Sequence, residues 1–137
     1  MTISFRDSAD DVVPSHLGGF FVGWPTGPTP ETHLRLLHAS DRVVIAIDES
    51  LGVVVGFATA LTDGVLAAFI SFVEVLPSHQ GRGIGRGLIQ RLLDSMRDLY
   101  MVDVTCDADL QPFYRMAGMK PATGMILRRY DAQAGVS

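Results

Sequence analysis

A glycine-rich loop, Gln80-Gly81-Arg82-Gly83-Ile84-Gly85, is the part of the sequence with the clearest capacity for chemistry. The apolar pattern changes from strand-like to helix-like across it. The first N–H groups of a helix have no partner within the helix, and the helix dipole adds partial positive charge there. Glycines here and at position 87 remove side chains that would hold a phosphate away. The loop predicts a phosphate site with Arg82 and Arg86 at its rim; a ligand-free tight turn is the alternative.

Two familiar phosphate-binding patterns do not fit this loop. The Walker pattern ends in Gly-Lys followed by Ser or Thr, whereas Gly85-Arg86-Gly87-Leu88 has neither the lysine nor the hydroxyl. The dinucleotide pattern G-x-G-x-x-G would place Leu88 or Arg86 where its third glycine belongs. A protein that binds ATP or NAD is therefore a disfavoured interpretation.

A single acid interrupts an otherwise apolar stretch just before the loop. Glu74 lies within Val65–Val75, where burial would favour a carboxylate that accepts protons. It could act as a general base, or it could form a structural ion pair. Successive strand side chains alternate, so Glu74 should face away from Val73 and Val75 unless a bulge re-aims it.

The other reactive side chains have less distinctive settings. Cys106 has no recognisable histidine partner, and we expect it to be a buried thiol at the end of a strand. His79 is expected to be a solvated loop residue. His33 and His38 are five positions apart and do not share a helix face well enough to bind a metal, so no metal site is predicted.

Short strands and helices must position these residues. Thr29-Pro30 predicts the start of a helix over Glu31–Ala39. Apolar spacing predicts a second helix from Gly83 to Leu99. Turn signals and strand-like runs predict the remaining elements: strands at 43–47, 52–61, 65–75 and 100–104, a short helix at 110–116, and a last strand at Met125–Tyr130.

The order of these elements predicts an α+β fold, with a mixed sheet on which helices pack. The stretch Val65–Val75 is apolar on both faces, so it should be the deeply buried central strand. With 137 residues, 47% of them hydrophobic, we expect one domain over residues 1–137 with a real core.

Composition and charge limit the classes of molecule that this protein is expected to bind and the compartment in which it is expected to work. A net charge of −4 argues against a nucleic-acid binder. The local group Arg82, Arg86 and Arg91 suggests a small anionic ligand, with a solvated helix face as the alternative. No apolar run approaches the roughly 18 residues that cross a membrane, and no secretory signal is recognised. The single cysteine fits a reducing compartment, so a cytoplasmic location is expected.

The loop and a second motif together resemble the GNAT superfamily of acyl-CoA-dependent N-acetyltransferases. Gln80–Gly85 matches the pattern Q/R-x-x-G-x-G/A, and Pro112–Met119 looks like the family's F-Y-x-x-x-G-F with methionine in the last place. The resemblance covers roughly residues 42–130. It implies a mostly antiparallel sheet that splays after the fourth strand, with helices on both faces.

The resemblance also implies roles for single residues. The backbone of Val73 and Val75 would pair with the pantetheine arm of acetyl-CoA, and the amides of Gly81–Arg86 would hold its diphosphate. The cofactor-binding set is Val73, Val75, Gln80, Gly81, Arg82, Gly83, Ile84, Gly85 and Arg86. Tyr114 matches the tyrosine that protonates the departing thiolate in many members, although it could instead pack under the cofactor. Asp107 departs from the asparagine of many relatives.

The expected function is acetyl transfer from acetyl-CoA to a primary amine by direct attack, with Tyr114 as the acid and Glu74 or water as the base. The acceptor is expected to be a small molecule, and many relatives form homodimers. A non-catalytic acyl-CoA-binding module with the same fold is the alternative, because the base is not fixed by the sequence.

Overall fold

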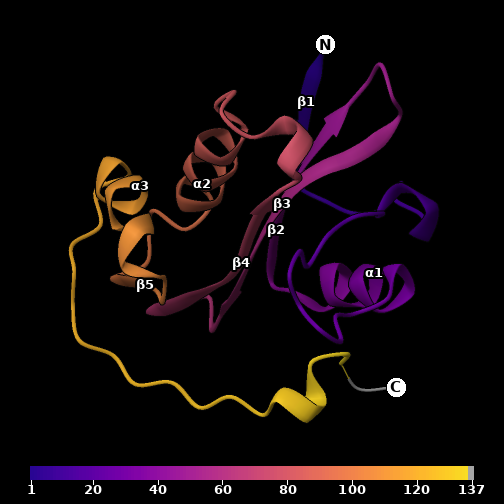
Figure 1. Cartoon of the computed structure of the whole chain (residues 1–137). Coiled ribbons are helices and arrows are strands. Elements are labelled where there is room, and N and C mark those ends of the chain that lie inside the picture. The colour runs from indigo at the N-terminus through magenta and orange to yellow at the C-terminus, as the bar shows by residue number, and fades with distance from the viewer. Residues whose placement is uncertain (136–137) are drawn as a thin grey trace.

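The computed structural model describes residues 1–135, which are built around one five-stranded sheet in the order β1-β2-β3-β4-β5 (Figure 1). The strands are Ile3–Arg6 (β1), Arg42–Asp48 (β2), Val53–Thr62 (β3), Ala67–Val75 (β4) and Met101–Val104 (β5). Neighbouring strands are antiparallel except β4 and β5, which are parallel. The α+β fold with a mixed sheet is confirmed. The sequence does not predict β1, because four residues are too few to reveal a period.

The most deeply buried strand is β3 rather than β4. Seven consecutive residues of β3, Val54–Ala60, are buried, whereas β4 is only half-buried from Ser71 to Val75. The prediction that Val65–Val75 forms the central, doubly buried strand is therefore wrong. The physical reason is that β3 has a long neighbour on each side, while β5 covers only part of β4.

The sheet opens along the second half of β4. Strand β5 pairs with β4 only over Ala67–Ile70, so the edge of Ser71–Val75 that faces away from β3 has no neighbouring strand among the described residues. Ser71 is an extra residue in β4, since Thr59 pairs with Phe72 and Ala60 pairs with Ile70. A bulge of this kind bends a strand and increases its twist. The splay after the fourth strand is thus present.

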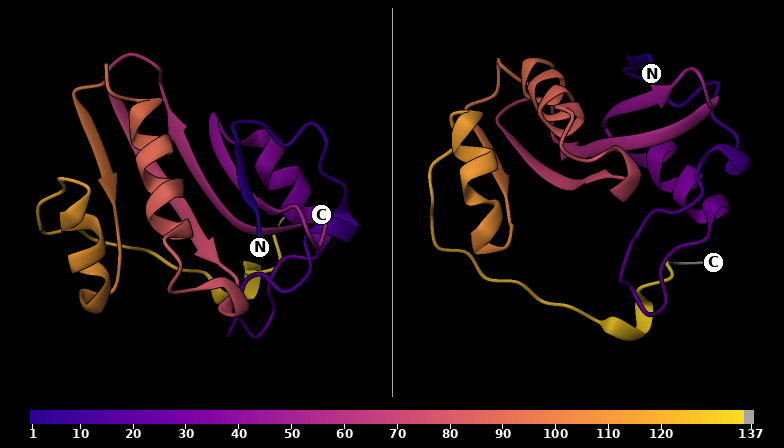
Figure 2. Two further views of the ribbon diagram at one scale, coloured as in Figure 1. Left: turned by 90° about the horizontal axis from the view of Figure 1, so that it is seen from above. Right: turned by 45° about the horizontal axis from the view of Figure 1, so that its top comes forward.

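Helices cover both faces of the sheet, as Figures 1 and 2 show. Helix α1, Pro30–Ala39, begins after Thr29, whose hydroxyl accepts a hydrogen bond from the Thr32 N–H at 3.2 Å. One face of α1 packs against the segment of residues 7–29 between β1 and α1, called the N-terminal loop here. Together with the sheet they form one buried cluster, which contains Ala9, Val12, Leu17, Phe21, Leu37, Ile45, Val54 and Phe57.

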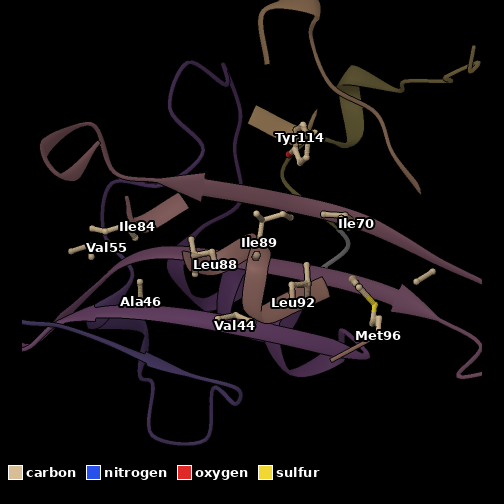
Figure 3. Close-up of a cluster of buried hydrophobic side chains, with 13 residues drawn as sticks. Val44, Ala46, Val55, Ile70, Ile84, Leu88, Ile89, Leu92, Met96 and Tyr114 are labelled. Carbon is tan, nitrogen blue, oxygen red and sulfur yellow. The ribbon is translucent and has the colours of Figure 1, made fainter. Parts of the chain in front are cut away.

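Helix α2, Ile84–Asp94, packs on the opposite face and forms the second cluster (Figure 3). It contributes Ile84, Leu88, Ile89 and Leu92, while α3, Gln111–Met116, adds Tyr114. Helix α2 ends before the predicted Leu99. The Ser95 hydroxyl donates to the Leu92 carbonyl at 2.6 Å, and such local bonds compete with helix continuation.

The chain after α3 does not return to the sheet. The predicted strand Met125–Tyr130 is wrong: residues 119–129 form no helix or strand, and Tyr130–Ala132 is a short 3-10 turn (η4). Figure 1 and the right view of Figure 2 show this segment looping away from the sheet. The sequence has strand character, but a strand needs a neighbouring edge, which the described residues do not bring to it. Within residues 1–135, no helix is long and apolar enough to span a membrane.

Candidate functional site

The glycine-rich loop joins the end of β4 to the start of α2 through the 3-10 turn η2, Pro77–His79. Gly81 and Gly83 have φ angles of +76° and +81°. These values lie in the left-handed region, where a side chain costs about 1–2 kcal/mol, so glycine is needed at both positions. Gly83 is the N-cap residue of α2, and no side chain caps it.

Six consecutive N–H groups, from Gly81 to Arg86, have no backbone acceptor in the described chain. The first bond of the helix is from the Gly87 N–H to the Gly83 carbonyl at 3.0 Å. A Cβ atom built on Gly81 or Gly83 would meet nothing within 4 Å, so open space adjoins these amides. Arg82 and Arg86 are both exposed beside them. The loop therefore presents free N–H donors and positive charge to an anion.

The glycines at 85 and 87 face packed side chains, but only Gly87 is required by packing. A Cβ on Gly85 would lie 3.5 Å from the Phe113 ring and 3.7 Å from Val75, in ordinary contact. A Cβ on Gly87 would lie only 2.6 Å from Phe5 Cζ. The expectation that glycine at position 87 makes room for a phosphate is therefore wrong, because it makes room for the ring of Phe5 on β1.

A buried hydrogen-bonded chain ties the loop to the sheet. His79 Nε2 lies 2.8 Å from Asp48 Oδ2 at the end of β2, and His79 Nδ1 lies 2.7 Å from the Ser78 hydroxyl. His79 is 7% exposed and Asp48 is 2% exposed, so the prediction of a solvated His79 is wrong. The pKa of Asp48 is lowered to about 2, first by the hydrogen bond from the Ser50 hydroxyl and then by that from His79. The hydrogen bond between His79 and Asp48 fixes the start of the glycine-rich loop against the end of β2.

The loop is also joined to the opened half of β4. The Gln80 side-chain amide donates to the Val75 carbonyl at 3.0 Å, and the Leu76 N–H donates to the Val55 carbonyl at 2.9 Å. Polar groups alternate between the two edges of an antiparallel strand. The backbone N–H and C=O groups of Val73 and Val75 therefore face away from β3. They lie on the edge of β4 that β5 leaves unpaired, because β5 pairs only with Ala67–Ile70.

A cleft of about 340 Å³ lies beside this part of β4. Its lining is largely aromatic and aliphatic, with one acid: Phe21, Val22, Trp24, Phe72, Val73, Glu74, Val75, Pro77 and Gln80. The cleft brings together four residues predicted from the sequence, namely Val73, Glu74, Val75 and Gln80. It adds the aromatic residues of the N-terminal loop, for which the sequence carries no motif.

Glu74 holds the N-terminal loop. Its two carboxylate oxygens accept hydrogen bonds from the Phe21 N–H at 3.0 Å and the Val22 N–H at 3.3 Å. Phe21 has a φ angle of +60°, which makes it the only non-glycine residue with positive φ in residues 1–135. Such strain persists where the surroundings hold it, and the carboxylate supplies two of the bonds that do so. The hydrogen bonds to the Glu74 carboxylate thus come from backbone amides.

Tyr114 lies on α3 and is 8% exposed, in the cluster on the α2 side of the sheet (Figure 3). Its ring meets that of Phe113 edge-on at 5.0 Å between centroids. Burial raises the pKa of its phenol, and the nearby Cys106 thiol adds to this. Cys106 itself is exposed, so the expectation of a buried thiol is wrong; it lies two residues beyond the end of β5. Tyr114 is thus held in the buried cluster on the α2 side of the sheet, whereas Glu74 is bonded to the N-terminal loop.

His33 is buried without hydrogen-bond partners. It is 1% exposed, and neither ring nitrogen has a partner in the described residues. Its ring is surrounded by those of Phe20, Phe21 and Phe57, at centroid distances of 5.2, 4.9 and 4.4 Å. Burial lowers its pKa to about 4. Across residues 1–135, no group of His, Cys, Asp and Glu is arranged to hold a metal ion.

Comparisons with known proteins agree with the family resemblance and with the fold. The model of the acetyltransferase (GNAT) family matches residues 9–119. A crystal structure of a Deinococcus radiodurans R1 protein assigned to the acetyltransferases is 47% identical, with a TM-score of 0.95, and the match covers 98% of this chain and 94% of that one.

Curated relatives match over shorter stretches. The uncharacterized N-acetyltransferase ycf52 of Porphyra purpurea is 31% identical over 71% of this chain and 58% of the relative. The chloroplastic serotonin N-acetyltransferase 2 of Oryza sativa subsp. japonica is 38% identical over 71% of this chain and 50% of the relative. The chain therefore spans about half the length of the curated relatives that it matches.

Proposed function

The chain belongs to the GNAT acetyltransferase family, and on that premise we propose that it transfers an acetyl group from acetyl-CoA to the primary amine of a small molecule. The observation that carries this proposal is the row of unpaired N–H groups from Gly81 to Arg86 at the start of α2. The predicted cytoplasmic location, the single domain and the roles of individual site residues stay predictions.

The diphosphate of CoA would lie against these amides. Gly81 and Gly83 leave open space there, and the exposed Arg82 and Arg86 can pair with phosphate oxygens. The bond from the Gln80 side chain to Val75 and the contact of His79 with Asp48 hold the loop in place before any ligand arrives. A preformed loop supports this role, because less entropy is lost on binding.

The pantetheine arm would extend along the opened edge of β4. The outward-facing backbone groups of Val73 and the Val75 N–H can bond to it as a neighbouring strand would, while the Val75 carbonyl is already bonded to the Gln80 side chain. The Val75 N–H would then lie near the thioester carbonyl, where one such donor to the tetrahedral oxyanion can contribute about 3 kcal/mol.

In the reaction, the amine nitrogen attacks the acetyl carbonyl carbon, a C–N bond forms, and the C–S bond breaks. The proton lost by the amine passes to a base, and the departing thiolate takes a proton from Tyr114. Burial raises the pKa of Tyr114, so the phenol is fully protonated before transfer. The aromatic cleft of Phe21, Trp24 and Phe72 would receive the apolar part of the acceptor.

The two alternatives for Glu74 now differ in support. Both carboxylate oxygens are bonded to amides of the N-terminal loop, which favours a structural role over that of a base. A water held in the cleft would then carry the proton away. The second candidate function, a non-catalytic acyl-CoA-binding module, is favoured by the same observation, since no other acid lines the cleft.

Calorimetric titration with CoA tests binding, and thiol release from acetyl-CoA across a panel of amines tests turnover. We expect micromolar binding and turnover with at least one small amine. The Tyr114→Phe variant should bind CoA equally well and lose about 10²–10⁴-fold in kcat. Binding without turnover for any amine would favour the module, whereas absence of CoA binding would reject both functions.

A further inference from the structure

The segment of residues 120–129, called the C-terminal arm here, makes almost no contact with the rest of the chain. Its apolar side chains are exposed: Met125 is 97%, Ile126 63% and Leu127 68% exposed. Residues 120–128 take part in no backbone–backbone hydrogen bond within residues 1–135; the Leu127 carbonyl accepts only from the Arg128 side chain, at 3.4 Å. Three adjacent apolar side chains with unpaired backbone are the usual mark of a surface that is covered by a partner.

The arm is nevertheless held at both ends. At its start, the Met119 N–H donates to the Tyr114 carbonyl at 3.1 Å, which fixes the turn after α3. Beyond its end, Gly135 lies against α1, where a Cβ built on it would be 2.9 Å from Thr32 Cγ2. Figure 1 and the right view of Figure 2 show the arm bridging from the α3 side of the molecule to the α1 side. Its course therefore leads away from its own β5.

The outer edge of β5 is unpaired in the described residues, because β5 is the last strand of the sheet. The charges near it are complementary to those of the arm. Residues 101–111 contain Asp103, Asp107 and Asp109 and no basic residue, whereas the arm contains Lys120, Arg128 and Arg129 and no acid. Opposite charges on adjacent strands favour pairing. The edge and the arm are thus matched in unpaired backbone and in charge.

A related crystal structure indicates that this extended course is stable. The Deinococcus radiodurans R1 protein superposes with a TM-score of 0.95 over 98% of the chain, a value that an arm placed elsewhere would lower appreciably. An exposed apolar segment keeps such a course only if something packs on it, since burial of apolar surface is what offsets the loss of chain entropy.

We propose that two copies of this chain exchange their C-terminal arms, each arm lying along the outer edge of β5 of the other copy. The dimer has two-fold symmetry, because the same arm and the same edge are used twice. The arm adds a strand to the partner's sheet, covers the apolar residues 125–127, and pairs Arg128 or Arg129 with the acids near β5. This proposal does not depend on the acetyl acceptor or on CoA binding.

Light scattering during size exclusion tests the proposal, with the full chain and two matched variants. Leu127→Asp places a charge in the arm, and Leu51→Asp places the same charge at a turn between β2 and β3; these leucines are 68% and 62% exposed in one chain. We expect the unchanged chain to elute at twice its 14.8 kDa mass. Leu127→Asp should weaken dimerisation by at least about 100-fold, since each dimer loses two apolar contacts, and Leu51→Asp should have no effect.

Three results would overturn the arm exchange: a monomer at all concentrations, a dimer that Leu127→Asp leaves intact, or equal weakening by both variants. Hydrogen exchange supplies a second measurement that needs no variant. In the unchanged dimer, the amides of residues 124–128 should be protected, and their protection should fall on dilution to monomer. Unprotected arm amides in a stable dimer would equally reject the exchange.

Discussion

Burial of His33 should make the stability of this protein depend on pH in a defined window. The pKa of His33 falls from 6.5 in an unfolded chain to about 4, because burial penalises the charged ring. As pH decreases through 6.5, the unfolded chain takes up a proton that the folded protein refuses, so stability is lost between about pH 6.5 and pH 4. At about 1.36 kcal/mol per pKa unit, the loss amounts to about 3 kcal/mol.

The replacement His33→Leu keeps a similar volume among the surrounding phenylalanine rings and removes the titrating group. It also removes two ring nitrogens that lack partners, each of which costs roughly 1–3 kcal/mol when buried. Urea unfolding at pH 7 and pH 4 measures the effect, with His38→Leu at an exposed position of the same helix as the control. Between these pH values, His33→Leu should lose about 3 kcal/mol less than the unchanged protein. Equal losses in His33→Leu and the unchanged protein would refute the reasoning.

Three further predictions follow from the glycines and from Tyr114. Gly83→Ala and Gly64→Ala both force a side chain into positive φ, at +81° and +73°, with open space around the new Cβ. Both variants should lose about 1–2 kcal/mol of stability. Only Gly83→Ala should also weaken CoA binding in calorimetry, by about 10–100-fold. Equal CoA affinities of the two variants would contradict the phosphate site. Gly87→Ala should lower the free energy of unfolding in urea by about 1–3 kcal/mol, because the new Cβ clashes with Phe5. Adding Phe5→Leu should relieve this clash. A Gly87→Ala variant that is more stable than the unchanged protein would show that helix propensity outweighs the clash. Because burial raises the pKa of Tyr114, stability should fall as pH rises above about 10, and Tyr114→Phe should fall less; parallel curves would count against that burial.

The geometry of the glycine-rich loop could be predicted from sequence because it is local. Gln80–Gly85 supplies its own amides, its own glycines and the start of its own helix, so the spacing of these residues indicates the loop and its unpaired N–H groups. The order of the main strands and helices also follows from short-range patterns. The start of α1 is predicted for the same reason, since Thr29 caps a helix only a few residues away.

The remaining features depend on contacts between distant residues, which one sequence does not reveal. His79, in the turn η2, is buried against Asp48 at the end of β2, which accepts a hydrogen bond from it. Glu74 is bonded to a loop more than fifty positions earlier. The need for glycine at position 87 comes from Phe5 on the edge strand β1. Residues Met125–Tyr130 have the composition of a strand, but composition does not show whether an edge is present for them to pair with.

Nuclear magnetic resonance of the backbone amides during titration with CoA tests the central claim most directly. The N–H signals of Gly81 to Arg86 should move strongly downfield as CoA is added, since they have no acceptor in the described chain and would gain phosphate oxygens. Pantetheine, which lacks the diphosphate, should leave those six signals in place. If CoA binds while these amides do not move, the loop does not hold the diphosphate, and the account of this site is wrong.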